Sequence, residues 1–242
     1  STGFCSRRKA EEYIKKGLVY VDNVLVTELG TKVSYESEIV VDGNVLSNKE
    51  DKEYYLLYKK EGCVSTVSDE HNRKTVVSFI PTKSRIYPVG RLDYNTTGLL
   101  LLTNDGELTK ILTHPSHEVE KVYLAKINGI LTPEEFMKLK KGLVIEGRKV
   151  VPTYLKVKKI NKESDSSSVL IGIKEGRNHI VKKIFASMHH DVKKLKRETF
   201  AFLTLDGLKP GEYRHLTIKE VKKLSESGLP IFAICLGHQL MA

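Results

Sequence analysis

An arginine and an aspartate stand two residues apart in the segment GRLD at residues 90–93. The apolar run at residues 99–102 follows closely, and its length is typical of a buried central strand rather than a buried helix. Reactive side chains are commonly carried by loops that a rigid scaffold holds in place. Asp93 is therefore a candidate for acid, base or nucleophile chemistry. The alternative is a structural loop in which Asp93 caps a turn and Arg91 is solvated.

The composition limits the class of protein. The chain has 242 residues, 40% of them hydrophobic, which is enough for one large domain or two smaller ones. We expect neither a membrane span, which needs roughly 18 consecutive apolar residues, nor an export leader. Three widely spaced cysteines without a C-x-x-C pair argue against a disulfide framework or structural zinc, and favour a reducing cytoplasm. The formal net charge of +10 indicates a polyanionic partner.

Basic residues gather first in an expected helix at residues 6–17, which Ser6 caps and Gly17 ends. Ala10, Tyr13 and Ile14 recur at helical spacing and supply its buried face. The basic side chains would lie on the opposite face, where a solvated surface helix is the equal alternative. The candidates of this helix for binding a polyanion are Arg7, Arg8, Lys9, Lys15 and Lys16.

A second basic segment spans residues 174–197, with eight Lys or Arg against two acids. Its charges alternate with apolar helix positions, so we expect the cations to share one face and to follow a phosphate backbone. A solvated face is the usual alternative, but the local excess matches the excess of the whole chain. The candidates are Lys182, Lys183, Lys193, Lys194, Lys196 and Arg197.

Short strands and a few helices fill the rest of the chain. We expect strands at 18–21, 24–27, 38–41, 45–46, 54–58 and 169–173. Helices are expected at about 133–141, with Thr132 and Glu135 forming a capping box, and at 178–188. A polar loop is expected at 161–168. Strands and helices without a regular βαβ rhythm favour an α+β fold with a mixed or antiparallel sheet.

The strings SRRKAEEYI at residues 6–14 and GLVYVDN at 17–23 resemble the S-four-type RNA-binding domain, a family named for a ribosomal protein. That family usually has one more helix before this point, so the resemblance implies a module clipped at its N-terminus. We expect this module at residues 1–47 and a polar linker at 48–53.

Three further strings, GRLD at 90–93, EKVYLA at 120–125 and KEGRNHIVKK at 174–183, resemble in order and spacing the RsuA/RluB-type pseudouridine synthases, which act on ribosomal RNA. The string LDGLKPGEYRHLT at 205–217 extends the resemblance to about residue 225, and THPS at 113–116 favours the RluB branch. The resemblance implies a catalytic domain at 54–225. The implied reaction is isomerisation of a specific uridine to pseudouridine, in large-subunit ribosomal RNA by the RluB similarity.

The resemblance also implies roles for individual residues. The glycosidic bond of a flipped-out uridine breaks, the base turns, and it rejoins through carbon five, without cofactor or metal. Asp93 either attacks the sugar or takes a proton from it, while Arg177 supplies the positive partner that lowers the Asp93 pKa. Tyr123 stacks on the base and acts as acid or base at carbon five. The substrate-binding candidates are Arg91, Ile180 and Lys121. A half-buried strand tyrosine and a core isoleucine are the alternatives for Tyr123 and Ile180.

We expect a cytoplasmic monomer that acts on ribosomal RNA or a pre-ribosomal particle, without a membrane or a metal ion. The rival hypothesis is a non-catalytic RNA-binding ribosome assembly factor. Such a protein would not need Asp93, Tyr123 and Arg177 together, and these residues therefore favour the enzyme.

Residues 226–242 do not fit this interpretation. The string PIFAICLGHQ at 230–239 resembles the nucleophile elbow of class I glutamine amidotransferases, most like the small subunit of carbamoyl-phosphate synthase. Cys235 would be the nucleophile, but Ala233 stands where that family usually has glycine, and the oxyanion loop, His and Glu partners are missing. A thiol without its base is not activated. We expect a foreign tail without amidotransferase activity.

Overall fold

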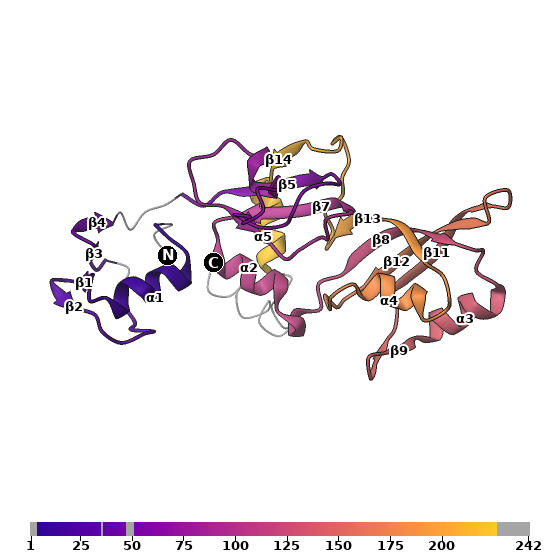
Figure 1. The fold of residues 1–242 in the computed structure, drawn as a ribbon, viewed down its shortest axis with the longest axis horizontal. Helices are drawn as coiled ribbons and strands as arrows, with labels where there is room; N and C mark the ends of the chain where they lie inside the picture. Colours follow the sequence, from indigo (N-terminus) through magenta and orange to yellow (C-terminus); the bar gives the residue numbers. More distant parts are fainter. Residues whose placement is uncertain (1–3, 35, 47–50, 227–242) are drawn as a thin grey trace, which may run out of the picture. The chain divides into compact units, whose positions relative to one another are not determined.

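The computed structural model describes residues 4–34, 36–46 and 51–226 (Figure 1). The described chain divides into two compact units. The first comprises the residues up to Glu53 together with Thr82–Ile86, and the second comprises Tyr54–Pro81 and the residues from Tyr87 onward. The return of Thr82–Ile86 to the first unit differs from the continuous segment expected at 54–225.

The first unit combines one helix with a small antiparallel sheet. Helix α1 (Arg7–Lys15) begins after Ser6, whose hydroxyl accepts a hydrogen bond from the Lys9 backbone at 3.2 Å. The sheet has the order β2 (Val24–Leu25), β1 (Val19–Val21), β3 (Ile39–Val41) and β4 (Asn44–Leu46). Tyr13 and Ile14 pack on its buried valines, so the predicted apolar face of the helix is confirmed.

The second unit is built on a mixed sheet of eight strands. Seven strands follow one another in the order β11 (Tyr154–Asn161), β12 (Ser166–Ile173), β8 (Lys121–Asn128), β13 (Val192–Phe200), β7 (Thr96–Thr103), β5 (Tyr54–Lys59) and β14 (Tyr213–His215). The eighth, β6 (Tyr87–Pro88), pairs with β7. Only the β13–β7 pair among these described strands is parallel. The predicted α+β class with a mixed sheet is therefore confirmed.

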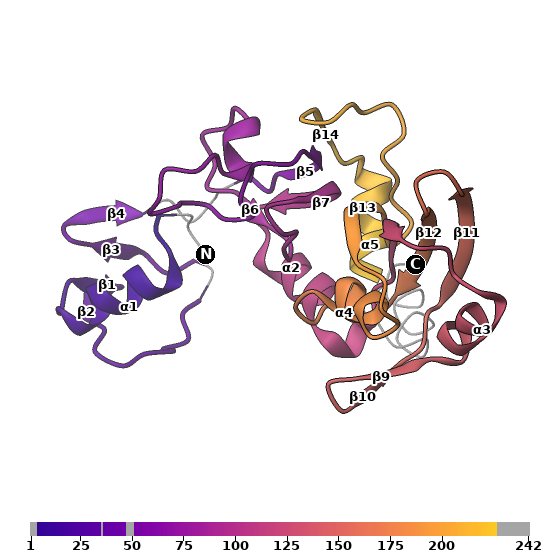
Figure 2. The same cartoon turned by 45° about the vertical axis from the view of Figure 1, so that its right-hand side comes forward.

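Apolar cores cover different parts of this sheet. Helices α2 (Gly106–Thr113) and α5 (Ile218–Glu226) contribute to a core with β5 and β7. Helices α3 (Pro133–Lys141) and α4 (Ile180–Ala186) pack with β8 and β12, next to the hairpin of β9 (Leu143–Ile145) and β10 (Arg148–Val150). Both views show α2 beneath β7 and α3 toward the β11 end of the sheet (Figure 1 and Figure 2). Two short 3-10 helices, Val76–Phe79 and Pro115–His117, complete the unit.

Local signals placed several elements correctly. The run at residues 99–102 lies in β7 and is buried. Helix α3 has the predicted capping box, because Thr132 and Glu135 each accept a hydrogen bond from the other's backbone.

The fold corrects three expectations. Helix α4 begins at Ile180 rather than at 178, because His179 adopts a left-handed backbone conformation with φ of 56°. Residues 166–168 belong to strand β12 instead of the expected loop. The stretch Val192–Phe200 is a strand in which Lys193 and Lys194 are exposed but Arg197 is buried. The single basic face expected for residues 174–197 is therefore wrong.

The parallel pair brings β13 unusually close to β7. Arg197 lies opposite Gly98, which has φ of +113°. A Cβ atom at Gly98 would lie 2.2 Å from the Arg197 carbonyl oxygen. This register therefore requires glycine at position 98.

Hydrogen bonds connect helix α5 to strand β14. Thr217 and Glu220 form a reciprocal cap, and Arg214 donates two hydrogen bonds to Glu220, at 2.8 and 2.9 Å. These bonds to Arg214, together with those from Thr217, outweigh burial and lower the pKa of Glu220 to about 2.

Candidate active site

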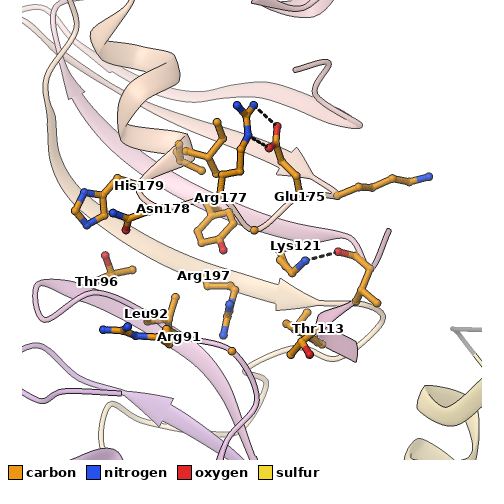
Figure 3. Close-up of a pocket in the computed structure, with 18 of the residues that line it drawn as sticks. Arg91, Leu92, Thr96, Thr113, Lys121, Glu175, Arg177, Asn178, His179 and Arg197 are labelled. Atoms are coloured by element: carbon orange, nitrogen blue, oxygen red, sulfur yellow. Dashed lines mark hydrogen bonds and ion pairs between the residues drawn. The ribbon is translucent and has the colours of Figure 1, made fainter. Parts of the chain in front are cut away.

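A cavity of about 910 Å³ opens within the second unit (Figure 3). Its volume lies within the range of small-ligand sites. The lining residues come from the loop at 89–93, the turn after α2, strands β8 and β13, and the β12–α4 junction. The three strings that resemble pseudouridine synthases thus meet around one cavity. The lining includes the predicted site residues Asp93, Tyr123, Arg177, Arg91, Ile180 and Lys121.

Asp93 is half-buried at the cavity wall and has two nitrogen partners. Lys182 Nζ donates to its Oδ2 at 2.6 Å, and His179 Nε2 lies 3.1 Å from its Oδ1. Burial acts to raise the pKa of Asp93, but the hydrogen bond and charge of Lys182, with the His179 charge, outweigh it and hold that pKa below its usual range. The carboxylate is therefore ionised and available as a base or nucleophile.

The loop that carries Asp93 rests on a buried lysine. Lys59, at the end of β5, is 0% exposed, and its Nζ donates to the carbonyl oxygens of Asp93 at 2.9 Å and Thr96 at 2.8 Å. Ser65 further exchanges two hydrogen bonds with the backbone of Leu92. These bonds hold the loop backbone in one conformation. Sequence reasoning missed Lys59, although a lysine closing an apolar strand is an unusual signal.

The expected ion pair between Arg177 and Asp93 is wrong. The Arg177 guanidinium instead donates to Glu175 (Figure 3). It also donates to the Ile145 carbonyl oxygen at 2.8 Å. Glu175, two residues before Arg177, binds the guanidinium, whereas Lys182 contacts Asp93 from the first turn of α4. The charge partner of Asp93 is therefore Lys182, which sequence reasoning had assigned to RNA phosphates.

Strands β8 and β13 form another part of the wall. Tyr123 is half-buried, lies opposite Arg197 in the sheet, and packs against the core around β12 and α4. Ile180 belongs to the same core and also lines the cavity, so the core and wall interpretations are compatible. Lys121 donates to the Val119 carbonyl oxygen at 2.8 Å, and burial, followed by the Arg197 charge, lowers the pKa of Lys121 to about 8.

In the described part of the chain some RNA-binding candidates are exposed and unpaired, whereas others form ion pairs or are buried. The exposed ones without an ion pair among the described residues are Arg7, Arg8, Lys15, Lys16, Lys193 and Lys194. Lys9, Lys183 and Lys196 form ion pairs with Glu12, Glu146 and Glu198. Arg197 is 3% exposed and lines the cavity, so its expected place on a phosphate-binding surface is wrong.

Other predicted features concern metals, membranes and the tail. Among residues 4–34, 36–46 and 51–226, no group of three or more His, Cys, Asp or Glu is arranged to hold a metal ion. No helix in this described part is both long and apolar enough to cross a membrane. Cys235 and Ala233 lie outside the described residues.

Comparisons with known families match both units. An RNA pseudouridylate synthase model matches residues 53–187, and an S4 domain model matches residues 1–40. A class I glutamine amidotransferase model matches residues 175–242, of which residues 175–226 include α4, β13, β14 and α5 of the second unit.

Individual relatives agree with the synthase match. The chain is 47% identical over 223 residues to "Ribosomal large subunit pseudouridine synthase B" of Bacillus subtilis, covering 92% of this chain and 91% of that protein. It is 38% identical over 226 residues to an uncharacterized RNA pseudouridine synthase of Aquifex aeolicus, with coverages of 92% and 89%. The solved structure described as "Crystal structure of pseudouridylate synthase" has a TM-score of 0.65 and 31% identity, with coverages of 92% and 95%. The chain belongs to the RNA pseudouridylate synthase family, with an S4 domain at its N-terminus.

Proposed function

We propose that this protein converts a specific uridine of large-subunit ribosomal RNA to pseudouridine. The observation that carries the proposal is Asp93, held ionised by Lys182 and His179 at the wall of a cavity that also contains Tyr123. The relative from Bacillus subtilis, 47% identical to this chain, is named for the large ribosomal subunit, which supports the same substrate class.

The reaction begins when the target uridine leaves the RNA stack and enters the cavity. Tyr123 stacks on the base, and Ile180 forms an apolar wall beside it. Asp93 then acts on the sugar, either by bonding to carbon one or by taking the proton from carbon two. In both routes the bond from carbon one to N1 of uracil breaks, and its electron pair leaves with the base.

The base then turns so that its carbon five faces the sugar. Carbon five supplies an electron pair to carbon one, which releases Asp93 from carbon one in the first route. In the second route Asp93 returns the proton to carbon two at this step. The proton of carbon five moves to N1, through Tyr123 in this proposal, which completes the isomer. Lys182 takes the role of charge partner that the sequence had suggested for Arg177. Arg177 and Glu175 order the junction before α4, and Arg91 contacts the RNA at the cavity mouth.

Basic side chains outside the cavity contribute the phosphate contacts that offset the cost of removing a base from its stack. The exposed lysines Lys193 and Lys194 serve the catalytic unit, and the exposed face of α1 grips a neighbouring RNA stem. The protein acts as a monomer in this proposal. Ribosomal RNA as substrate supports action in the cytoplasm.

Pseudouridine mapping of ribosomal RNA tests the proposal. Cells that lack the protein should lose pseudouridine at a defined large-subunit position, and the wild-type gene should restore it. Asp93→Asn should fail to restore the modification while retaining RNA affinity. Asp191→Asn, which removes an exposed acid outside the cavity, is the matched control and should restore it. Unchanged mapping in the deletion strain, or restoration by Asp93→Asn, would refute the proposal.

A further inference from the structure

Two cations, Lys121 and Arg197, lie side by side on the cavity wall. They come from neighbouring antiparallel strands, where Lys121 pairs with Phe200 and Arg197 pairs with Tyr123. Lys121 Nζ lies 5.7 Å from the centre of the Phe200 ring, and Arg197 Cζ lies 5.2 Å from the same centre. Both residues line the cavity that contains Asp93 (Figure 3).

The guanidinium of Arg197 has unused donor capacity. Its Nε donates to the Leu99 carbonyl oxygen at 2.7 Å, but its buried Nη2 has no hydrogen-bond partner among the described residues. Leaving a buried charged donor unsatisfied costs free energy. Its position in the cavity wall indicates that a bound ligand supplies the missing acceptor.

Lys121 adds a second uncompensated charge. In the described part of the chain neither Lys121 nor Arg197 forms an ion pair, although they repel each other. The nearby Glu175 carboxylate is engaged by Arg177. Asp93 has its own partners in Lys182 and His179, so these cations are not needed to neutralise it. The pair therefore fits a ligand that carries negative charge.

We propose that Lys121 and Arg197 stabilise the uracil anion that forms when the base leaves the sugar. This inference rests on the proposed function. When the bond to N1 breaks, the electron pair spreads over the ring nitrogens and carbonyl oxygens of the base. The two cations donate hydrogen bonds to this charge, until carbon five returns the electron pair to the sugar and the proton of carbon five moves to N1.

The placement favours the base over a phosphate as the bound anion. Tyr123, the stacking residue, lies directly opposite Arg197 in the sheet and two residues from Lys121 on the same face. A flipped base enters the cavity, whereas the phosphodiester groups remain on the strand outside it.

Single-turnover kinetics with a target RNA fragment tests the assignment. Lys121→Met removes the charged donor and keeps an unbranched side chain one atom shorter. It should slow uridine isomerisation roughly 10²-fold, the loss typical when one donor to a developing negative charge is removed. RNA affinity and its salt dependence should not change. Lys121→Arg should restore much of the rate. Lys126→Met removes the same charge from the exposed face of β8 and should leave the rate unchanged.

A second substrate separates anion stabilisation from a structural role. Fluorine at carbon five stabilises the departing base, so cleavage of the bond to N1 in a 5-fluorouridine target should depend less on the two cations. The deficit of Lys121→Met should shrink on this substrate. Arg197→Lys, which keeps a charge but removes Nη2, should show the same smaller deficit. It provides an independent test if Lys121→Met lowers the melting temperature.

Three outcomes would overturn the inference. They are a wild-type rate in both variants, equal deficits on uridine and 5-fluorouridine, and a loss of RNA affinity with a flatter salt dependence, which marks a phosphate contact. Wild-type activity in the same assay with any of these results leaves the proposed function standing. An inactive wild-type protein on ribosomal RNA would refute both.

Discussion

Replacing Lys182 by methionine removes the positively charged partner of Asp93 and tests its contribution to the reaction. The ion pair joins Lys182 Nζ and Asp93 Oδ2 at 2.6 Å, with side chains 34% and 31% exposed. A hydrogen bond to a charged group contributes about 1.5–3 kcal/mol, and this exposure places the bond near the lower value. If ionised Asp93 reacts, Lys182→Met should slow single turnover about tenfold at a pH below the Asp93 pKa. There, loss of about 1.4 kcal/mol that favours the carboxylate lowers its ionised fraction about tenfold.

The pH dependence gives the same substitution a second readout. Lys182 lowers the pKa of Asp93, so its removal raises that pKa. Activity that requires the carboxylate is lost as the pH falls through this pKa. The acidic limb of the rate profile should therefore move to higher pH in Lys182→Met, whereas Lys182→Arg should keep the wild-type limb.

Lys183→Met is the matched control for this experiment. Lys183 is the next residue of α4 and pairs with Glu146 at 2.6 Å, so its replacement removes the same charge from the same helix. Pseudouridine formation should be measured in both variants under single-turnover conditions with saturating enzyme. Equal losses in the two variants, or an unmoved acidic limb in Lys182→Met, would show that Lys182 does not act through Asp93.

Three other properties can be measured on the purified protein. Glu220→Gln removes the ion pair with Arg214 of β14 and should lower the free energy of unfolding by about 1.5 kcal/mol at neutral pH, as measured by urea titration. This difference should disappear as the pH falls from 4.5 to about 2, because wild-type Glu220 becomes protonated there. Gly98→Ala should lower the free energy of unfolding in urea by about 2–5 kcal/mol, because its Cβ would clash with the Arg197 carbonyl oxygen. The control Gly106→Ala places its Cβ at an ordinary contact distance, and equal stability of the two variants would contradict the strand register. Deleting residues 228–242 should leave pseudouridine formation unchanged, since all lining residues of the cavity precede residue 201. Loss of this activity in the truncated protein, or glutaminase activity of the full chain, would contradict the prediction.

Features with a local cause could be predicted from the sequence. The capping box of α3 and the apolar spacing of α1 depend on residues within one or two turns, and both were found as expected. The apolar run in β7 was found for the same reason, because its length alone distinguishes it from a helix.

Features that depend on distant pairing could not be predicted in this way. The cations of residues 174–197 were expected to share one face, but the part from Val192 onward is a strand whose conformation depends on pairing with β7 and β8. The partner of Asp93 depends on how α4 is oriented, which places Lys182 rather than Arg177 beside the carboxylate. The support from Lys59 likewise joins residues that are 34 positions apart.

The parallel pairing of β13 with β7 has a consequence for how the protein reaches its native state. It brings Leu195 beside Thr96, so almost a hundred residues must be synthesised and folded back before this central pair can close. Contacts of such sequence separation slow folding, because the chain loses the conformational entropy of a long loop before the contact contributes any stabilising free energy. Asp93 therefore leaves the ribosome long before Lys182 and the strand that completes the cavity wall. The nascent chain carries its carboxylate for most of its synthesis without an assembled site, and catalysis begins only after the C-terminal half has folded.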